Sequence, residues 1–197
     1  MKKLKGEGMH KHSKDNVFLG FWIYMMTDLL MFAVLFATYT VLRNNTNGGI
    51  GISEIFDPPF VLVETLILLT SSFTCGLALL ALNKMDKTKT LLHLGVTALL
   101  GIVFLCMELY EFSRLISEGH DYTKSAFLSS FFTLLSFHGL HILAGTFWIV
   151  SLLIHIKLFG LQDTNTRKVR LLTIFWHFLD IVWIFIFTIV YLMGGIL

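Results

Sequence analysis

Five long apolar stretches, separated by short polar segments, dominate the pattern along this chain. Each stretch is continuous rather than alternating and is at least about 20 residues long, which is the length that a helix needs to cross a bilayer. The pattern therefore predicts an all-α, polytopic membrane protein with five transmembrane helices in a bundle. The fourth stretch is longer than a bilayer requires, so we expect it to tilt or protrude. The expected spans are 18–42, 60–82, 91–112, 126–157 and 169–193.

The segment before the first span is different in character. Residues 1–16 contain five lysines and two histidines and no apolar run. We interpret them as a mobile, basic cytoplasmic tail near lipid headgroups, and residues 17–197 as a single five-helix transmembrane domain. The first apolar stretch follows a hydrophilic lead and is too long for a cleavable signal peptide, so we expect it to remain as an anchor.

Composition agrees with a membrane protein. Hydrophobic residues make up 55% of the 197 and charged residues only 14%, far from the proportions of an ordinary soluble domain. Both cysteines, Cys75 and Cys106, lie inside apolar stretches, and no Cys-x-x-Cys pair is present, so neither a disulfide framework nor a cysteine metal site is expected. The net charge of +2 is too small to indicate a nucleic-acid surface.

The basic residues are distributed unevenly between the two ends of the predicted spans. Twelve of the 15 Lys and Arg residues lie in the N-terminal segment and in the second and fourth loops, and only Arg43, Arg114 and Lys124 lie on the other side. Cytoplasmic loops of membrane proteins carry an excess of Lys and Arg. The N-terminus is therefore predicted to be cytoplasmic and, because the number of crossings is odd, the C-terminus to lie outside.

Every predicted span also contains ionisable side chains, which are costly in hydrocarbon and usually face protein groups or a water-filled cavity. His177 and Asp180 are three residues apart in the last span, so they share a helix face and can interact. From the predicted spans, we expect the glutamates near the outer ends of their helices and the remaining groups near the middle. The candidate buried polar residues are Asp28, Glu64, Glu108, Glu111, His138, His141, His177 and Asp180.

Two kinds of metal chemistry fit these groups poorly. A di-metal carboxylate site uses Glu-x-x-His pairs on paired helices, and no span here has one. Haem ligation by His177 and a histidine of the fourth span has few usable ligands, because His138 and His141 lie on one helix face. We therefore favour interhelical hydrogen bonds as the role of His138 and His141.

Asp28 leaves two interpretations open. Its span contains no Lys or Arg, so an ionised carboxylate there would be costly, and we expect it to be protonated at neutral pH beside a protein-lined or lipid-lined cleft. It could belong to a proton path with His177 and Asp180, or it could simply pack between helices.

Four motifs of the spans carry aromatic, glycine and ionisable residues at fixed spacing. They are Gly20-Phe21-Trp22-Ile23-Tyr24 with Thr27-Asp28 and Phe32, Glu108-Leu109-Tyr110-Glu111-Phe112, His138-Gly139-Leu140-His141 with Gly145, and Trp176-His177-Phe178-Leu179-Asp180-Ile181-Val182-Trp183. Together these motifs resemble subunit III of the haem–copper respiratory oxidases. The similarity covers nearly the whole chain after the basic tail, and two further segments, 60–65 and 187–194, are most similar to the bo-type ubiquinol oxidase branch. The chain lacks the first two helices of the seven-helix members.

The resemblance implies a non-catalytic subunit of a proton-pumping terminal oxidase in the bacterial inner membrane. Haem, copper and the ubiquinol site would belong to partner subunits, with no cofactor in this chain. The chain would stabilise catalytic subunit I, lie in a complex that also contains subunits II and IV, bind phospholipid in a cleft and support proton uptake from the cytoplasmic side. A cytochrome c oxidase subunit III remains an alternative, and so does a self-sufficient membrane metal or haem redox enzyme.

The charge asymmetry gives a first testable prediction. A reporter that is active only outside the cytoplasm is expected to be active when fused after Leu197 and inactive when fused in the second loop, at 84–89. The measurement is reporter activity normalised to the amount of fusion protein. A C-terminal fusion that scores as cytoplasmic would reverse the predicted orientation.

Overall fold

The computed structural model describes residues 2–55 and 57–196, and this part of the chain is built from helices joined by short loops, with no strand. The side chains of residues 2–15 lie outside the described part. The elements are α1 (Lys2–Leu42), α2 (Ile52–Ile55), α3 (Pro58–Asn83), α4 (Lys87–Ser117), α5 (Ala126–Phe159), α6 (Asp163–Ile186), the π-helix η1 (Phe187–Leu192) and α7 (Met193–Ile196).

Five helical segments are long and apolar enough to cross a membrane, which confirms the predicted number and positions of the spans. The fourth occupies all 34 residues of α5, in agreement with its expected excess length. The backbone of α1 continues as helix through the basic segment to Lys2. The mobility of that segment and its place near headgroups stay predictions. The observed spans are Asn16–Leu42, Pro58–Asn83, Lys87–Ser117, Ala126–Phe159 and Asn165–Leu192.

Local sequence signals explain where several helices begin and end. Proline occupies the first positions of α3, where its missing N–H costs nothing. Asp86 caps α4 by accepting a hydrogen bond from the backbone N–H of Lys89, and this bond lowers the pKa of the Asp86 carboxyl. Ser125 caps α5 in the same way, with Leu128 N–H as the donor at 3.1 Å. Gly160 ends α5 with a φ of +74°, a conformation that favours glycine.

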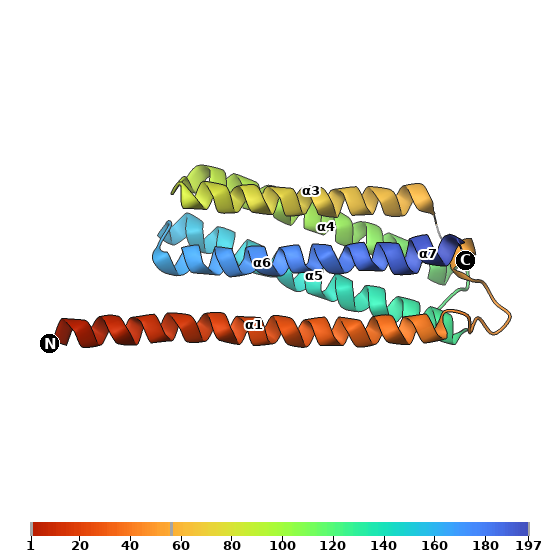
Figure 1. Ribbon diagram of the computed structural model, residues 1–197. Coiled ribbons are helices and arrows are strands. Elements are labelled where there is room, and N and C mark those ends of the chain that lie inside the picture. The colour runs from red at the N-terminus through yellow and green to blue at the C-terminus, as the bar shows by residue number, and fades with distance from the viewer. Residues whose placement is uncertain (1, 56, 197) are drawn as a thin grey trace.

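The helices lie roughly antiparallel in one elongated bundle (Figure 1). Helices α3, α4, α5 and α6 pack around a common core, each mainly against two of the others, while α1 lies mainly against α5 and touches α6 only lightly. The turns between α3 and α4 and between α5 and α6 lie at the end that carries the N-terminus, and the C-terminus lies at the opposite end (Figure 1).

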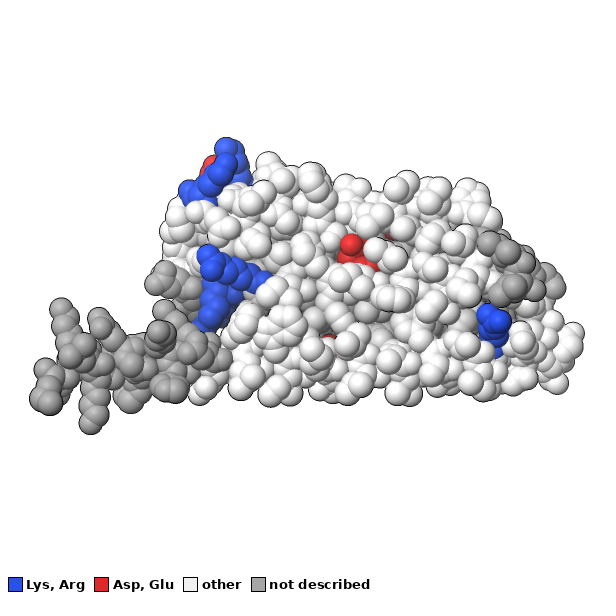
Figure 2. All heavy atoms as spheres, viewed as in Figure 1, with Lys and Arg blue, Asp and Glu red and all other residues white. Residues whose placement is uncertain are grey.

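This arrangement separates the two groups of basic residues. The lysines and arginines of the α3–α4 and α5–α6 turns lie at the N-terminal end of the bundle, and Arg43, Arg114 and Lys124 lie at the other. Figure 2 shows basic atoms at both ends of one face and an uncharged surface between them, interrupted about midway by a small acidic spot. The uncharged belt is the part of the surface suited to contact lipid tails or other membrane helices.

Small residues allow the large Trp176 side chain to enter the bundle. Trp176 on α6 is 1% exposed. A Cβ atom at Gly101 on α4 would lie 2.9 Å from its indole ring, and one at Gly145 on α5 would lie 3.0 Å from it. Because packed interiors leave little free volume, α4 and α5 can approach α6 this closely only with glycine at both positions.

Two glycine substitutions on α4 test this packing. Gly101→Ala is expected to lower the apparent Tm of the detergent-purified protein, because overpacking costs about 1–3 kcal/mol. Gly95→Ala is the matched control, since nothing lies within 4 Å of a Cβ at that position. Equal melting temperatures for the two variants would contradict the close contact with Trp176.

Candidate functional site

Helix α6 is joined to α3 by hydrogen bonds from two buried tryptophans. The indole N–H of Trp176 donates to the Ser71 hydroxyl at 3.0 Å, and that of Trp183 donates to the Thr65 hydroxyl at 3.1 Å. The tryptophans are seven residues apart, about two helical turns, so both lie on one face of α6. Because α3 and α6 run in opposite directions, the two bonds together fix the register of one helix against the other.

His177 extends this contact between the two helices. Its Nδ1 lies 2.8 Å from the Ser72 hydroxyl of α3, within hydrogen-bonding distance. Asp180, one turn further along α6, is close enough to His177 to interact electrostatically, as their spacing predicted. One carboxylate oxygen of Asp180, Oδ1, has no hydrogen-bond partner among the described residues. His177 therefore has its hydrogen-bond partner on α3 and an electrostatic partner on its own helix.

His138 lies at the centre of the bundle and is 0% exposed. Its Nε2–H donates to the backbone carbonyl of Leu179 at 3.2 Å, which links α5 to α6. The rings of Phe104 and Trp183 lie 5.8 and 5.2 Å from the imidazole. This environment supports the interpretation that His138 joins helices.

Asp28 is paired with His141. The Oδ2 atom of Asp28 on α1 lies 3.7 Å from Nε2 of His141 on α5, which is within ion-pair distance but too long for a hydrogen bond. The other ring nitrogen of His141 donates to the carbonyl of Phe137 at 2.7 Å. The span of Asp28 contains no Lys or Arg, as the sequence shows, and the side chain at ion-pair distance is a histidine of a distant helix. This pair is a polar connection between α1 and the rest of the bundle.

The glutamates form a second buried group. Glu64 on α3 is 0% exposed, and Glu108 and Glu111 on α4 are 4% and 2% exposed. The hydroxyl of Tyr191, on the π-helix η1, donates to Oε2 of Glu111 at 3.1 Å. The carboxylate of Glu108 occupies the space that a side chain at residue 139 would need.

The position of Glu108 corrects one prediction. The glutamates were expected at a different depth from the histidines, yet Glu108 lies against Gly139, the neighbour of His138 in sequence. The depth was counted from a span ending at residue 112, whereas α4 continues to Ser117. At a rise of about 1.5 Å per residue, five additional residues place Glu108 about 7.5 Å further from the helix end than predicted.

With this geometry in view, similarity to known proteins decides the family. Residues 3–195 match the family model described as cytochrome c oxidase subunit III. The chain belongs to this family. It is 52% identical to the cytochrome bo(3) ubiquinol oxidase subunit 3 of Pseudomonas aeruginosa, over 95% of this chain and 91% of that protein.

Two further relatives show the range of the family. The quinol oxidase subunit 3 of Bacillus subtilis is 44% identical over 89% of this chain and 86% of its own length. The cytochrome c oxidase subunit 3 of Bacillus sp. strain PS3 is 46% identical over 91% of this chain and 86% of its own length. With five apolar helices and bacterial relatives over most of its length, this subunit III is a multi-pass protein of the bacterial inner membrane.

Several polar groups of this subunit III bind to other helices of the same chain. Among the described residues, no three His, Cys, Asp or Glu side chains are grouped so that they could hold a metal ion. His138 and His177 each use one ring nitrogen in a contact with another helix. The arrangement binds helices together and holds protonatable groups inside the membrane.

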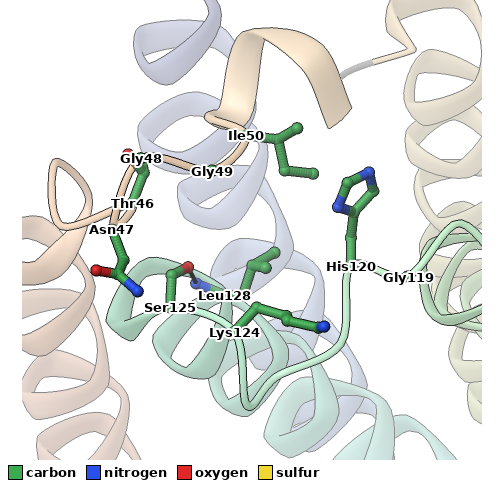
Figure 3. A pocket seen from close by; sticks show the side chains of 10 residues that line it. All are labelled: Thr46, Asn47, Gly48, Gly49, Ile50, Gly119, His120, Lys124, Ser125 and Leu128. Atoms are coloured by element: carbon green, nitrogen blue, oxygen red, sulfur yellow. Dashed lines mark hydrogen bonds between the residues drawn. The ribbon is translucent and has the colours of Figure 1, made fainter.

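The hollow in Figure 3 lies at the end of the bundle opposite the N-terminus, between the loop after α1 and the loop before α5, and measures about 510 Å³. Its basic side chains, His120 and Lys124, belong to a surface loop. The Ser125 hydroxyl that borders it already caps α5. Nothing in this hollow matches a candidate residue predicted from the sequence.

The sequence did not identify two of the hydrogen-bond partners, Thr65 and Tyr191. Thr65 follows Glu64 and Tyr191 lies in an apolar segment, and each is an ordinary residue for a membrane helix. Only their hydrogen bonds to Trp183 and Glu111 distinguish them. Ser71 and Ser72 were visible as adjacent hydroxyls, but their partners on α6 were not.

The Trp176–Ser71 bond can be measured with a double-mutant cycle. Trp176→Phe and Ser71→Ala are each expected to destabilise the protein, and the double variant should be less destabilised than the sum by about 1 kcal/mol, the usual contribution of such a bond. Denaturant unfolding in detergent gives the coupling. Trp22→Phe is the control, because that ring is 42% exposed. Strict additivity would show that the hydrogen bond contributes nothing.

Proposed function

We propose that this chain is the subunit III of a ubiquinol-oxidising haem–copper terminal oxidase that reduces oxygen to water and pumps protons. The observation that carries the proposal is the 52% identity over 95% of the chain with a relative named as a bo(3) ubiquinol oxidase subunit 3. The 46% identical Bacillus sp. relative named as a cytochrome c oxidase subunit 3 supports cytochrome c as the second candidate donor.

The chain contributes structure and environment to this complex, and partner subunits carry haem, copper and the quinol site. Most side chains of the membrane-spanning part of α1 are exposed in the isolated chain, and many of them are large and apolar. Such a face supports coverage by catalytic subunit I, by subunits II and IV, and by phospholipid in a cleft. In this position the subunit stabilises subunit I and supports its proton uptake from the cytoplasmic side.

Purification through a tag on this chain tests the proposal. The complex isolated in mild detergent is expected to contain the other subunits, haem and copper, and to consume oxygen with ubiquinol and not with reduced cytochrome c. Turnover with reduced cytochrome c alone would establish the second candidate donor. Haem or metal retained by the chain after the other subunits are removed would instead support a self-sufficient redox enzyme.

Histidine substitutions test the absence of redox centres from this chain. His138→Ala and His177→Ala are expected to leave haem and copper per assembled complex unchanged. The amount of complex should fall, because Ser72 or the Leu179 carbonyl loses its partner at a cost of about 1–3 kcal/mol. Loss of a haem absorption band in proportion to assembled complex would identify the histidine as a ligand.

Asp28→Asn tests whether Asp28 supplies protons or only packs. An amide keeps the shape and a polar contact with His141 but cannot titrate, so assembly, oxygen consumption and the pumping ratio are expected to stay normal, since we assign the proton path to subunit I. Asp28→Leu is the control and should lower the yield of complex, because it removes the polar partner of His141. A well-assembled Asp28→Asn complex that pumps poorly would place Asp28 in the proton path.

A further inference from the structure

Three carboxyl groups of this subunit are buried with too few partners. Neither oxygen of Glu64 has a hydrogen-bond partner among the described residues, and one oxygen of Glu108 and one of Glu111 share this condition. All three side chains are at least nine-tenths buried, with exposures of 0%, 4% and 2%. A buried carboxylate oxygen without a donor is costly, so each of these atoms indicates that something must bind there.

The three groups also interact with one another. Glu64 lies within electrostatic range of both Glu108 and Glu111, although it belongs to a different helix. Glu108 and Glu111 are one turn apart on α4 and interact as well. Three negative charges on interacting side chains would repel one another strongly inside the bundle, where the dielectric constant is low.

Among the described residues, Arg114 is the one cation that interacts with this group, and it is shared. Arg114 interacts with Glu111, but its guanidinium also lies 3.9 Å from Asp57 and 4.0 Å from Glu118. His138, next in sequence to the Gly139 that Glu108 contacts, is 0% exposed and uses its Nε2–H for the Leu179 carbonyl, and its Nδ1 has no hydrogen-bond partner among the described residues. The nearby positive charge can therefore balance at most one carboxylate.

The contacts of Tyr191 identify the carboxylate that stays ionised. Its hydroxyl donates to Oε2 of Glu111, and a donor stabilises the ionised form of an acid. Glu111 is also the glutamate of the three that interacts with Arg114. The charge thus belongs on Glu111, and Glu64 and Glu108 require protons.

We propose that Glu64, Glu108 and Glu111 form one proton-binding site, which holds two protons shared among three carboxyl groups at neutral pH. Its ligand is the proton. Arg114 lies one turn beyond Glu111 and reaches the carbonyl of Ile55 and the carboxylate of Asp57, at the end of the bundle opposite the N-terminus. The protons exchange with the water at that end, so the site belongs to the side of the membrane predicted to be external.

Infrared spectroscopy of the tagged, assembled complex tests this site. Protonated carboxyl groups have a C=O stretch that ionised carboxylates lack, and the bands of the site are expected to shift in D₂O because their protons exchange. Glu64→Gln and Glu108→Gln should each remove intensity and also shift the remaining band, because the carboxyls share protons. Asp86→Asn, at the opposite end of the same helix, is the control and should change nothing, because an asparagine can also cap a helix.

Tyr191→Phe provides a variant that keeps all three acids. Loss of the hydroxyl donor should weaken the ionised form of Glu111 and shift the carboxyl bands in an otherwise assembled complex. If a Gln variant does not assemble, the Tyr191→Phe shift and the D₂O shift of the unmodified complex decide the matter.

Two results would overturn the proposal. One is an assembled complex whose protonated-carboxyl bands are untouched by Glu64→Gln, Glu108→Gln and Tyr191→Phe. The other is a set of bands that disappear independently with each Gln variant and do not shift, which would mean separate acids. Both measurements are independent of the electron donor, so they stand apart from the test of quinol oxidation.

Discussion

Polar groups inside a membrane must find their partners within the protein, because hydrocarbon offers none. In this chain that constraint acts most strongly between α3 and α6. Two indole N–H groups and a histidine of α6 bond to hydroxyls of α3, and the pairs Trp183–Thr65 and Trp176–Ser71 follow one another in antiparallel order. These bonds set the register in which all other contacts of α6 are made.

Packing of the remaining helices follows from that register. With Trp176 held by Ser71, its ring lies against Gly101 and Gly145, and these glycines bring α4 and α5 to α6. The second tryptophan, Trp183, lies 4.7 Å from the Phe104 ring of α4. One hydrogen-bonded helix face therefore organises four helices, and the fifth, α1, is joined to the bundle by contacts with α5 that include the Asp28–His141 pair.

The ionisable groups fall into two classes with different consequences. His138 and His177 have partners on other helices and hold the bundle together. The glutamates have fewer hydrogen-bond partners than their oxygens can accept. Tyr191, which donates to Glu111, lies on a π-helix. This conformation is rare in proteins, and where it occurs it is often at a functional site. In the proposed proton-binding site, these glutamates hold protons inside the membrane-spanning part of the subunit.

The sequence by itself determined the five spans, the separation of the basic residues and the family, because hydrophobic length, charge and contiguous motifs are properties of neighbouring residues. It also marked polar side chains of the spans, of which Asp28, His138 and the three glutamates are buried and His141, His177 and Asp180 are half-buried. The tertiary structure alone decided their pairing: His141 with Asp28, Ser72 with His177 and Tyr191 with Glu111. Such pairs join segments far apart in the chain, and their geometry depends on helix ends and crossing positions. A shift of five residues in the end of α4 was enough to move Glu108 from the outer edge to the side of Gly139.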